Sequence, residues 1–274
     1  MHKSLPLSVA VITLNEENNL PRCLESVRDL AREIVIVDSG STDGTAQIAA
    51  QFGATFQFQK WLGHVEQKNV ALQRCSQPWV LALDADEVVS PELAQVIRDL
   101  LSTERRESGF FINRRTHYLG EWIWHSWYPE WRLRLVRQSQ ARWSGRDPHD
   151  KLEAPGDNGR LEGDLLHFSY HTLQDHLQRT IQYAKISANE LRQDGKTAHW
   201  YHLFFSPLLT FLKKIILRQG WRDGWRGWMI AFATSFGVFA KYAFLLEMQI
   251  TPKKPLPESA PAESSLVVGS INQR

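Results

Sequence analysis

The sequence predicts a doubly wound α/β fold, in which helices cover both faces of a mostly parallel β-sheet. Two observations predict it. Between residues 8 and about 100, runs of β-branched and other apolar residues alternate with segments of helical periodicity, and strands that are apolar along their whole length are typical of a parallel sheet. Three of these runs are also followed by acidic residues, at the edge where an open parallel sheet binds its ligands.

Four predicted strands and four predicted helices alternate in this region. Asn18 or Asn19 can cap the first helix, with Pro21 in its first turn, and Ser90 with Pro91 opens the fourth helix in the same way. The strands are SVAVITL, IVIVD, ATFQF and WVLALD, and the helices begin near residues 19, 44, 64 and 91.

The rest of the chain changes character twice. From residue 108 to 168 the pattern is less regular, and GFFINRRTHYLG, WRLRLVR and LLHFSY are predicted strands between loops rich in Trp. From about residue 172 the chain is predicted to be helical, ending near residue 250. The remaining tail contains four prolines and shows no periodicity, which predicts disorder. We therefore expect a catalytic domain of residues 1–170, a helical region of residues 171–250 and a disordered tail of residues 251–274.

Charge and hydropathy single out the C-terminal third. The 274 residues carry a net charge of only +2, but residues 195–254 contain nine Lys or Arg and two acids. Two apolar stretches there, HLFFSPLLTFLKKIIL and WMIAFATSFGVFAKYAFLL, are interrupted by Lys213, Lys214 and Lys241, so neither offers about 20 uncharged residues for a membrane span. Basic and Trp residues beside them favour helices that lie in the plane of an anionic membrane surface, and packing on the domain is the alternative.

The protein is predicted to be cytoplasmic and peripheral on the membrane. Cys23 and Cys75 show no metal-ligand spacing, which fits inert thiols in a reducing compartment. The N-terminal apolar run is short and meets Glu16 and Glu17, so it is predicted to be a strand rather than a signal peptide.

The strongest candidate for a chemical site is the acid pair of LALDADE. If the backbone stays extended past Leu83, Asp84 and Asp86 point to the same side and can face one ligand. Mg²⁺ and Mn²⁺ prefer oxygen ligands and often bind through one or two carboxylates plus substrate phosphates. The acids could instead cap a helix or fill a turn. Their place on a rim that also includes Glu16 and Asp38 favours the metal.

Asp38 and Lys68 are candidate ligands of a nucleotide. Asp38 ends IVIVD, where its carboxylate can accept a hydrogen bond from a nucleoside, whereas Asp43 of the following loop is expected to cap the next helix. Lys68 shares a predicted helical stripe with Val65 and Leu72, where a residue facing the sheet should be apolar. Its side chain could reach solvent or a phosphate site, and both alternatives remain open.

The stretch WSGRDPHDKLE, residues 143–153, is predicted to be a loop that contributes to the site. His149 can complete a metal shell and Asp150 can act as a general base, with Glu153 and Asp147 as the next candidates. The alternative is a solvated charged loop.

The Trp-rich segment WIWHSWYPEW has rings that could stack on sugars, bases or lipid. The later histidines 167, 171 and 176 show no ligand spacing, so core or surface roles are expected for them.

Four motifs taken together resemble a known family. VITLNEENNL, VDSGSTDGT, QKNVAL and LALDADE, in this order and spacing, resemble the inverting glycosyltransferases of family 2, which have the Rossmann-like GT-A fold and use nucleotide sugars. The likeness covers residues 8 to about 170. YLGEWIWHSWYPEWRLRLVR, DPHDKLE, HFSY and GWRDGWRGWMIAFATSFGVFAKYAFLLE more narrowly resemble the bacterial lipopolysaccharide core β-1,4-glucosyltransferases, and extend the likeness to about residue 250.

The resemblance implies roles for single residues. Asp38 matches the family's nucleoside-contacting acid, and the two acids of its DxD motif match Asp84, near the ribose, and Asp86, on the metal. His149 and Asp150 match a motif that usually ends in His-Glu, whose acid is a candidate base. The full set expected is Glu16, Asp38, Lys68 and Asp84 for the nucleotide sugar, Asp86 and His149 for the metal, Asp150 as the base, and Trp127, Tyr128 and Glu130 for the acceptor.

The function implied by the resemblance is transfer of a hexose, glucose from UDP-glucose, to the heptose-containing inner core of lipopolysaccharide. The transfer would invert the anomeric configuration, use Mg²⁺ or Mn²⁺, and take place at the cytoplasmic face of the inner membrane, with no nucleic acid partner. A polyprenyl phosphate or a capsule precursor is the alternative acceptor. A nucleotidyltransferase is disfavoured because NEENN stands where a Gly-rich basic loop is needed, and a non-catalytic glycan-binding protein is the remaining alternative.

Overall fold

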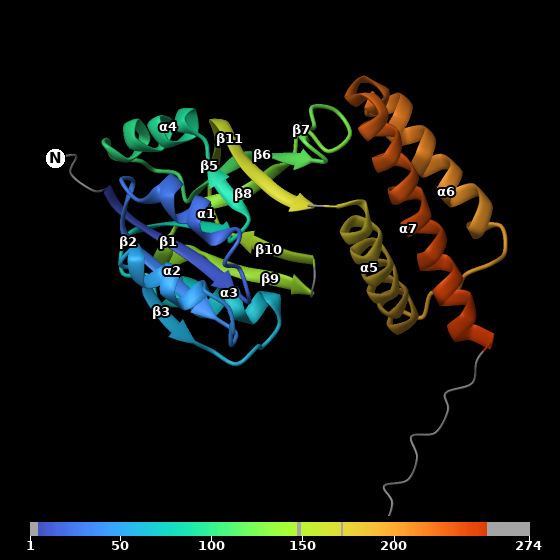
Figure 1. The fold of residues 1–274 in the computed structure, drawn as a ribbon, viewed down its shortest axis with the longest axis horizontal. Helices are drawn as coiled ribbons and strands as arrows, with labels where there is room; N and C mark the ends of the chain where they lie inside the picture. Colours follow the sequence, from blue (N-terminus) through green and yellow to red (C-terminus); the bar gives the residue numbers. More distant parts are fainter. Residues whose placement is uncertain (1–4, 147–148, 171, 251–274) are drawn as a thin grey trace, which may run out of the picture.

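The structure, a computed structural model, describes residues 5–146, 149–170 and 172–250 (Figure 1). Most of its strands form one sheet that helices flank, and three long helices follow. The strands are β1 Leu5–Thr13, β2 Ala31–Asp38, β3 Thr55–Phe58, β4 Trp79–Asp84, β5 Glu87–Val89, β6 Gly109–Tyr118, β7 Glu121–Trp122, β8 Trp131–Arg137, β9 Arg142–Arg146, β10 His149–Glu153 and β11 Asn158–Tyr170. The α-helices are α1 Leu20–Val27, α2 Thr45–Gln51, α3 His64–Gln73, α4 Pro91–Leu101, α5 Leu173–Gln193, α6 His202–Leu212 and α7 Gly224–Ile250.

The first four strands form the parallel half of the sheet. Their order is β3-β2-β1-β4, and each neighbouring pair is parallel. The predicted alternation of strands and helices over residues 8 to about 100 is therefore confirmed. In the register of this half, Thr13 of β1 lies opposite Asp38 of β2, and Ile12 lies opposite Asp84 of β4. The carboxyl ends of these strands thus meet at one edge and bring the two acids to it.

Both faces of the parallel half are covered, which explains why its central strands β1, β2 and β4 are mostly apolar and buried. On one face, α1 and α4 pack their buried apolar residues, such as Leu24 and Ile97, against Val9 and Leu81 of the sheet. On the other face, α3 and a hairpin of β9 and β10 cover residues such as Val80. Full burial of one such side chain contributes about 2 kcal/mol, so the two faces hold the edge residues in a fixed geometry.

The second half of the sheet mixes parallel and antiparallel pairs. The order continues from β4 through β8, β6 and β11 to β5, and β7 pairs with β6. Only the β6 and β11 pair is parallel in this half of the described sheet. The strands predicted from GFFINRRTHYLG, WRLRLVR and LLHFSY are confirmed as β6, β8 and β11.

The prediction of a loop over residues 143–153 is wrong for its described part, which forms the β9–β10 hairpin. Trp143 lies opposite Leu152 in the hairpin, and both are buried against α3. The backbone of Trp143 also exchanges two hydrogen bonds with the side-chain amide of Asn69 on α3. Each strand of the hairpin therefore buries an apolar residue against α3, although most other residues of this stretch are charged or polar.

The C-terminal helices α5, α6 and α7 confirm the predicted helical region, and α7 lies between the other two (Figure 1). By length and composition, residues Gly220–Ile250 could cross a membrane, although 33% of the apolar window is buried inside the protein. A π-helical turn, Lys213–Leu217, and a 3₁₀ turn, Gly220–Asp223, connect α6 to α7. The division into domains stays a prediction, and the tail expected to be disordered lies outside the described residues.

Candidate functional site

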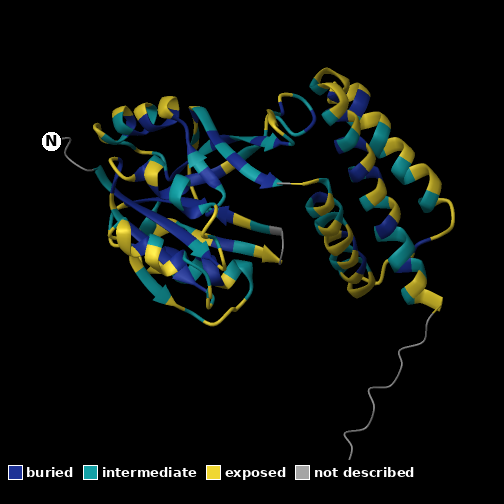
Figure 2. Cartoon of the chain, viewed as in Figure 1, coloured by how far each residue is buried: buried dark blue, intermediate teal, exposed yellow. Residues whose placement is uncertain are grey.

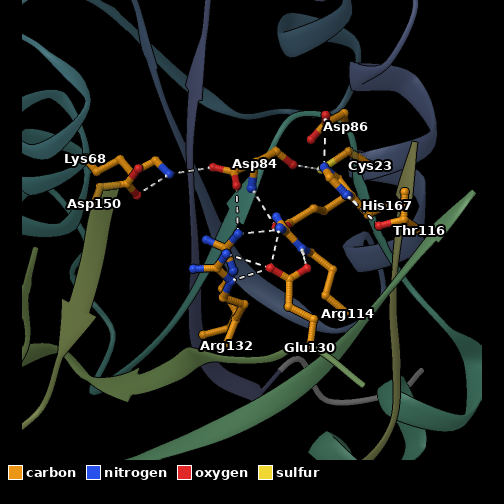
Figure 3. Close-up of polar contacts among 12 residues, drawn as sticks. Cys23, Lys68, Asp84, Asp86, Arg114, Thr116, Glu130, Arg132, Asp150 and His167 are labelled. Atoms are coloured by element: carbon orange, nitrogen blue, oxygen red, sulfur yellow. Dashed lines mark hydrogen bonds and ion pairs between the residues drawn. The ribbon is translucent and has the colours of Figure 1, made fainter. Parts of the chain in front are cut away.

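The candidate site lies where β4 ends at the carboxyl edge of the sheet (Figure 3). Asp84 is the last residue of β4, and a tight turn at Ala85 and Asp86 leads directly into β5. The backbone therefore does not stay extended past Leu83, which corrects the premise of the sequence argument. The carboxylates of Asp84 and Asp86 turn toward different partners, so the pair has two separate environments.

The Asp84 carboxylate is held between two buried cations. Its Oδ1 atom lies 2.8 Å from Lys68 Nζ, and its Oδ2 atom lies 2.7 Å from the guanidinium of Arg134. Burial raises the pKa of the Asp84 carboxyl, but Arg134 and Lys68 outweigh burial and lower its pKa well below the usual range. Asp84 is therefore ionised and orients both cations.

Lys68 points into the site and not to solvent. Its side chain is buried, and Nζ lies 2.8 Å from both Asp84 and Asp150 Oδ2. Burial lowers the pKa of the Lys68 ammonium, but these carboxylates raise its pKa above the ordinary value. The ammonium also lies 4.5 Å above the ring of Trp143. Of the two alternatives for Lys68, the structure has the inward orientation, and contact with a phosphate stays a prediction.

Arg134, Arg114 and Glu87 complete the network, and sequence reasoning missed all three as site residues. Glu87 is fully buried, accepts a hydrogen bond from the Asp84 backbone N–H, and lies 2.6 Å from Arg134 and 3.3 Å from Arg114. A signal for Arg134 was present in WRLRLVR, where an Arg stands between apolar residues of a strand, and residues 133–136 of β8 are all buried. A buried Arg needs an acid partner, so this position pointed to the site.

Asp86 lies against a histidine that sequence reasoning assigned to the core or the surface. The Asp86 Oδ2 atom is 3.3 Å from His167 Nε2 on β11, and His167 Nδ1 lies 3.3 Å from the Thr116 hydroxyl. Burial raises the pKa of the Asp86 carboxyl, but the contact with His167 outweighs it and the pKa is lowered. The candidate metal acid thus has His167 as its neighbour, placed there by the pairing of β11 with β5 and β6.

The donor set for a metal ion is small. Within residues 5–146, 149–170 and 172–250, no group of three or more His, Cys, Asp or Glu could hold a metal ion by itself. The backbone of His149 lies in β10 opposite Arg146, but its side chain lies outside the described part. One or two protein ligands suit a cation that takes its remaining ligands from substrate phosphates. Asp86 is a suitable ligand for such a cation. The described residues do not fit a cation site whose ligands all come from the protein.

Asp150 lies in the site, whereas Glu153 does not. Asp150 extends from β10, and its carboxylate shares the Lys68 ammonium with Asp84 (Figure 3). Glu153 instead pairs with the exposed Arg142 at 3.3 Å on the outside of the hairpin. Asp147 lies outside the described residues. Of the two candidate bases that the structure describes, the fold therefore brings Asp150 to the site and leaves Glu153 outside it.

Asp38 is buried and holds the loop that follows β2. Its Oδ2 atom accepts a hydrogen bond from the Thr13 hydroxyl at 2.8 Å, and its Oδ1 atom accepts from the backbone N–H groups of Gly40 and Ser41. Burial raises the pKa of the Asp38 carboxyl, but the hydrogen bonds from Ser41, Thr13 and Gly40 outweigh burial and lower it. The carboxylate thus fixes the shape of the edge where a nucleoside is expected.

Glu16 lies nearby on the same edge. It accepts a hydrogen bond from Asn19, and burial raises the pKa of its carboxyl. Its predicted contact with the nucleotide sugar stays a prediction.

Asp38→Ala is expected to weaken UDP binding by about tenfold or more, because the loop loses hydrogen bonds to an ionised acceptor, each worth about 1.5–3 kcal/mol. Isothermal titration calorimetry with UDP measures the change. Asp29→Ala, at an exposed turn, is the control and should bind as the wild type does. Equal UDP affinity in all three proteins would contradict the role of Asp38.

Of the three candidate acceptor residues, Glu130 belongs to the ion-pair network of Glu87 and Arg114, and the other two make separate contacts. Trp127 packs against Tyr118 and Tyr170, with ring centroids 5.3 Å and 5.7 Å apart. The Tyr128 hydroxyl donates a hydrogen bond to an Asp164 oxygen at 3.2 Å. The carboxylate of Glu130 pairs with Arg114 and Arg132. Acceptor binding by Trp127, Tyr128 and Glu130 stays a prediction.

The ion pairs of Glu130 are expected to make the free energy of unfolding depend on pH. Burial raises the pKa of its carboxyl, but Arg114 at 2.9 Å and Arg132 at 2.6 Å outweigh it and lower the pKa from 4.5 to about 2. A carboxyl with a lowered pKa stabilises the fold above its unfolded pKa, and this contribution is lost as the pH falls through the folded pKa. Glu130→Gln should therefore lower the free energy of unfolding by about 3 kcal/mol at pH 7. Urea unfolding should show a smaller loss at pH 3, and an equal loss at both pH values would contradict the assignment.

The chain is similar to known glycosyltransferases in sequence and in fold. The model of "Glycosyl transferase family 2" matches residues 8–152. The chain is 34% identical over 268 residues to the lipopolysaccharide core biosynthesis glycosyltransferase LpsC of Rhizobium meliloti, and the match covers 93% of this chain and 96% of LpsC. It is 27% identical over 256 residues to an uncharacterized glycosyltransferase of Rickettsia typhi, covering 89% of this chain and 88% of the relative.

A solved mannosyltransferase structure shares the fold. It is the mannosyltransferase PcManGT from Pyrobaculum calidifontis, in complex with GDP-mannose and Mn²⁺. The TM-score is 0.52 with 14% sequence identity, and the match covers 88% of each chain. The sheet and helices therefore have the GT-A arrangement that the sequence predicted, and the chain belongs to glycosyltransferase family 2 and is a glycosyltransferase.

Proposed function

We propose that the protein transfers a hexose, glucose from UDP-glucose, to a heptose of the lipopolysaccharide inner core, with inversion at the anomeric carbon. The observation that carries this proposal is that the fold gathers Asp84, Asp86, Asp150 and Lys68 at the carboxyl edge of one sheet. In this arrangement Asp84 would contact the ribose of the donor, Lys68 and Asp86 would serve its diphosphate, and Asp150 would be the base. The similarity to LpsC supports the lipopolysaccharide core as the acceptor.

The donor would lie along the carboxyl edge of β1, β2 and β4. Asp38 would meet the nucleoside, Asp84 would lie near the ribose, and Lys68 would face the phosphates. Asp86 would hold a divalent cation, Mg²⁺ or Mn²⁺, with His167 beside it and His149 as the further predicted ligand. When bound, such a cation would neutralise negative charge on the leaving diphosphate.

Asp150 would act as the general base. Its carboxylate accepts the proton of an acceptor hydroxyl while that oxygen attacks the anomeric carbon. The bond from the anomeric carbon to the diphosphate breaks, and its electron pair leaves with UDP. Because attack and departure take place on opposite faces, an α-linked donor gives a β-linked product. The contact with Lys68 keeps the Asp150 carboxylate oriented before the acceptor hydroxyl binds.

The place of action would be the cytoplasmic face of the inner membrane, with the protein bound peripherally. A lipid-linked acceptor requires the enzyme to work at a lipid surface, and the basic C-terminal third supports attraction to anionic lipids.

Mass spectrometry of core oligosaccharide tests this proposal in cells. A strain that lacks the protein should produce a core that lacks one inner-core hexose, and expression of the wild type should restore it. An unchanged core, or a defect confined to capsule or polyprenyl-linked glycans, would exclude the lipopolysaccharide core as the acceptor.

A further inference from the structure

Helix α6 has an apolar surface that the described part of the chain leaves exposed. Its sequence is HLFFSPLLTFL, yet none of its residues, all of which the structure describes, is buried (Figure 2). Leu208 and Leu209 are 53% and 64% exposed. A helix that is apolar around most of its circumference is normally buried in a core or in lipid.

Helix α7 extends this surface. Its large exposed side chains recur every three or four residues and so lie along one side of the helix. Phe211 joins the two helices, because its ring centroid lies 5.9 Å from that of Trp228 and 4.9 Å from that of Phe232. We call the combined surface the hairpin face: Phe204, Phe205, Leu208, Leu209, Leu212, Trp225, Trp228, Phe232, Phe236 and Phe239.

The connection between the two helices is basic. Lys213, Arg218 and Arg222 are exposed there, and residues 195–250 contain seven Lys or Arg against two acids. One of these acids, Asp223, has both carboxylate oxygens engaged in hydrogen bonds to the backbone of residues 124 and 126. Lys213, Arg218 and Arg222, the basic rim, lie at one end of the apolar, Trp-rich surface, and this combination matches the chemistry of an anionic lipid bilayer.

The opposite side of α7 packs against other parts of the protein. Ile230 packs with Tyr118 and Ile123 of the β6–β8 region, and Leu245 packs with Ala188 of α5. For α7 to cross a bilayer, these buried contacts would have to break. The geometry therefore suits a hairpin that lies in the plane of the membrane surface and uses only its outer side.

We propose that the hairpin face is the membrane-docking surface of the protein and inserts into the interface of an anionic bilayer. The proposal rests on the membrane location given under the proposed function, but it requires no part of the proposed chemistry. A lipid surface, and not a second copy of the chain, is the occupant that the basic rim favours.

The same connection also fixes the orientation of the acceptor loop, residues 123–128. Asp223 accepts hydrogen bonds from Trp124 N–H at 3.0 Å and Ser126 N–H at 2.7 Å, and Lys214 Nζ donates to the Ser126 carbonyl at 3.1 Å. A cavity of about 290 Å³ lies between this loop and the connection. Docking of the hairpin face would thus hold the acceptor loop at the lipid surface, where a lipid-linked sugar arrives.

Vesicle co-sedimentation of the full chain tests the apolar contribution. The wild type should bind vesicles of phosphatidylethanolamine and phosphatidylglycerol, and L208E/L209E should bind them at least about tenfold more weakly, because two exposed leucines no longer enter the lipid. Ile181→Glu, at a position of α5 that is 41% exposed, is the matched control and should bind as the wild type does.

A charge-reversal pair tests the basic rim. K213E/R218E should reduce binding to these anionic vesicles, whereas R32E/R74E, at exposed positions on the sheet domain, should not. Circular dichroism of every variant should match that of the wild type, since all the changed side chains are exposed.

Three results would overturn the proposal. The first is vesicle binding by L208E/L209E equal to that of the wild type, and the second is no binding by the wild type. The third is a wild-type dimer that L208E/L209E dissociates without any affinity for vesicles, which would make the hairpin face a subunit interface. Transfer to a deacylated core oligosaccharide in solution should be equal in wild type and L208E/L209E. If neither protein catalysed that reaction, while the wild type bound vesicles and L208E/L209E bound them more weakly, the proposed function would be refuted and the docking surface would be supported.

Discussion

Asp86→Asn is expected to lower the rate of sugar transfer by about a thousandfold. The change keeps the shape of the side chain and removes its negative charge, so a cation can no longer be held beside the diphosphate. Loss of one group that stabilises developing charge in an enclosed site typically costs about 2.7–4 kcal/mol of transition-state free energy. Release of UDP from UDP-glucose, with Mn²⁺ and acceptor present, measures the rate.

A second readout separates cation binding from catalysis. UDP with Mn²⁺ should raise the melting temperature of the wild type more than UDP alone does, and this difference should vanish in Asp86→Asn. Asp99→Asn, the same change at an exposed position of α4, is the matched control. Wild-type turnover by Asp86→Asn would show that the metal role of Asp86 is wrong.

Asp150→Asn is expected to lower kcat by about a hundredfold to ten-thousandfold, the usual contribution of a general base. The amide oxygen of Asn can still accept a hydrogen bond from Lys68, which Asp150 contacts at 2.8 Å. Donor binding and fold should therefore change little, and KM for the donor should stay close to that of the wild type. The loss should thus fall on kcat, as expected for a group that acts only when the acceptor oxygen attacks.

The Asp150 prediction has a natural control on the same hairpin. Glu153→Gln removes a charge that pairs with the exposed Arg142 and lies outside the site, so its kcat should equal that of the wild type. If Asp150→Asn retained wild-type kcat, the base would have to be another group, and Asp147 would be the next candidate.

The parallel half of the sheet could be predicted because its signals are local. Each strand is a continuous apolar run and each helix has its own periodicity, so β1 to β4 and α1 to α4 follow from short stretches of sequence. The position of Asp38 and Asp84 at one edge follows in turn, since parallel strands end on the same side of a sheet.

The remaining features depend on contacts between distant segments. Arg134 meets Glu87 across 47 positions of sequence, and Lys68 meets Asp150 across 82. No local pattern pairs such residues, because their proximity is created by the strand order β4-β8-β6-β11-β5. The contact of His167 with Asp86 could not be predicted for this reason: it comes from the pairing of β11 with β5 and is invisible in the spacing of the histidines.

The β9–β10 hairpin was mistaken for a loop for a related reason. Most of its residues are charged or typical of turns, but Trp143 and Leu152 are buried because α3 covers them. The apolar surface of α6 shows the converse: its composition predicts burial, and the rest of the described chain does not cover it.

Mass spectrometry and NMR of the product formed by the purified protein from UDP-glucose and a heptose-containing core acceptor test whether this site performs inverting hexosyl transfer. We expect a product one hexose heavier than the acceptor, with a new β linkage, formed with Mg²⁺ or Mn²⁺ and abolished by a chelator. An α-linked product, or no transfer from any UDP-hexose in the presence of cation and acceptor, would contradict the account.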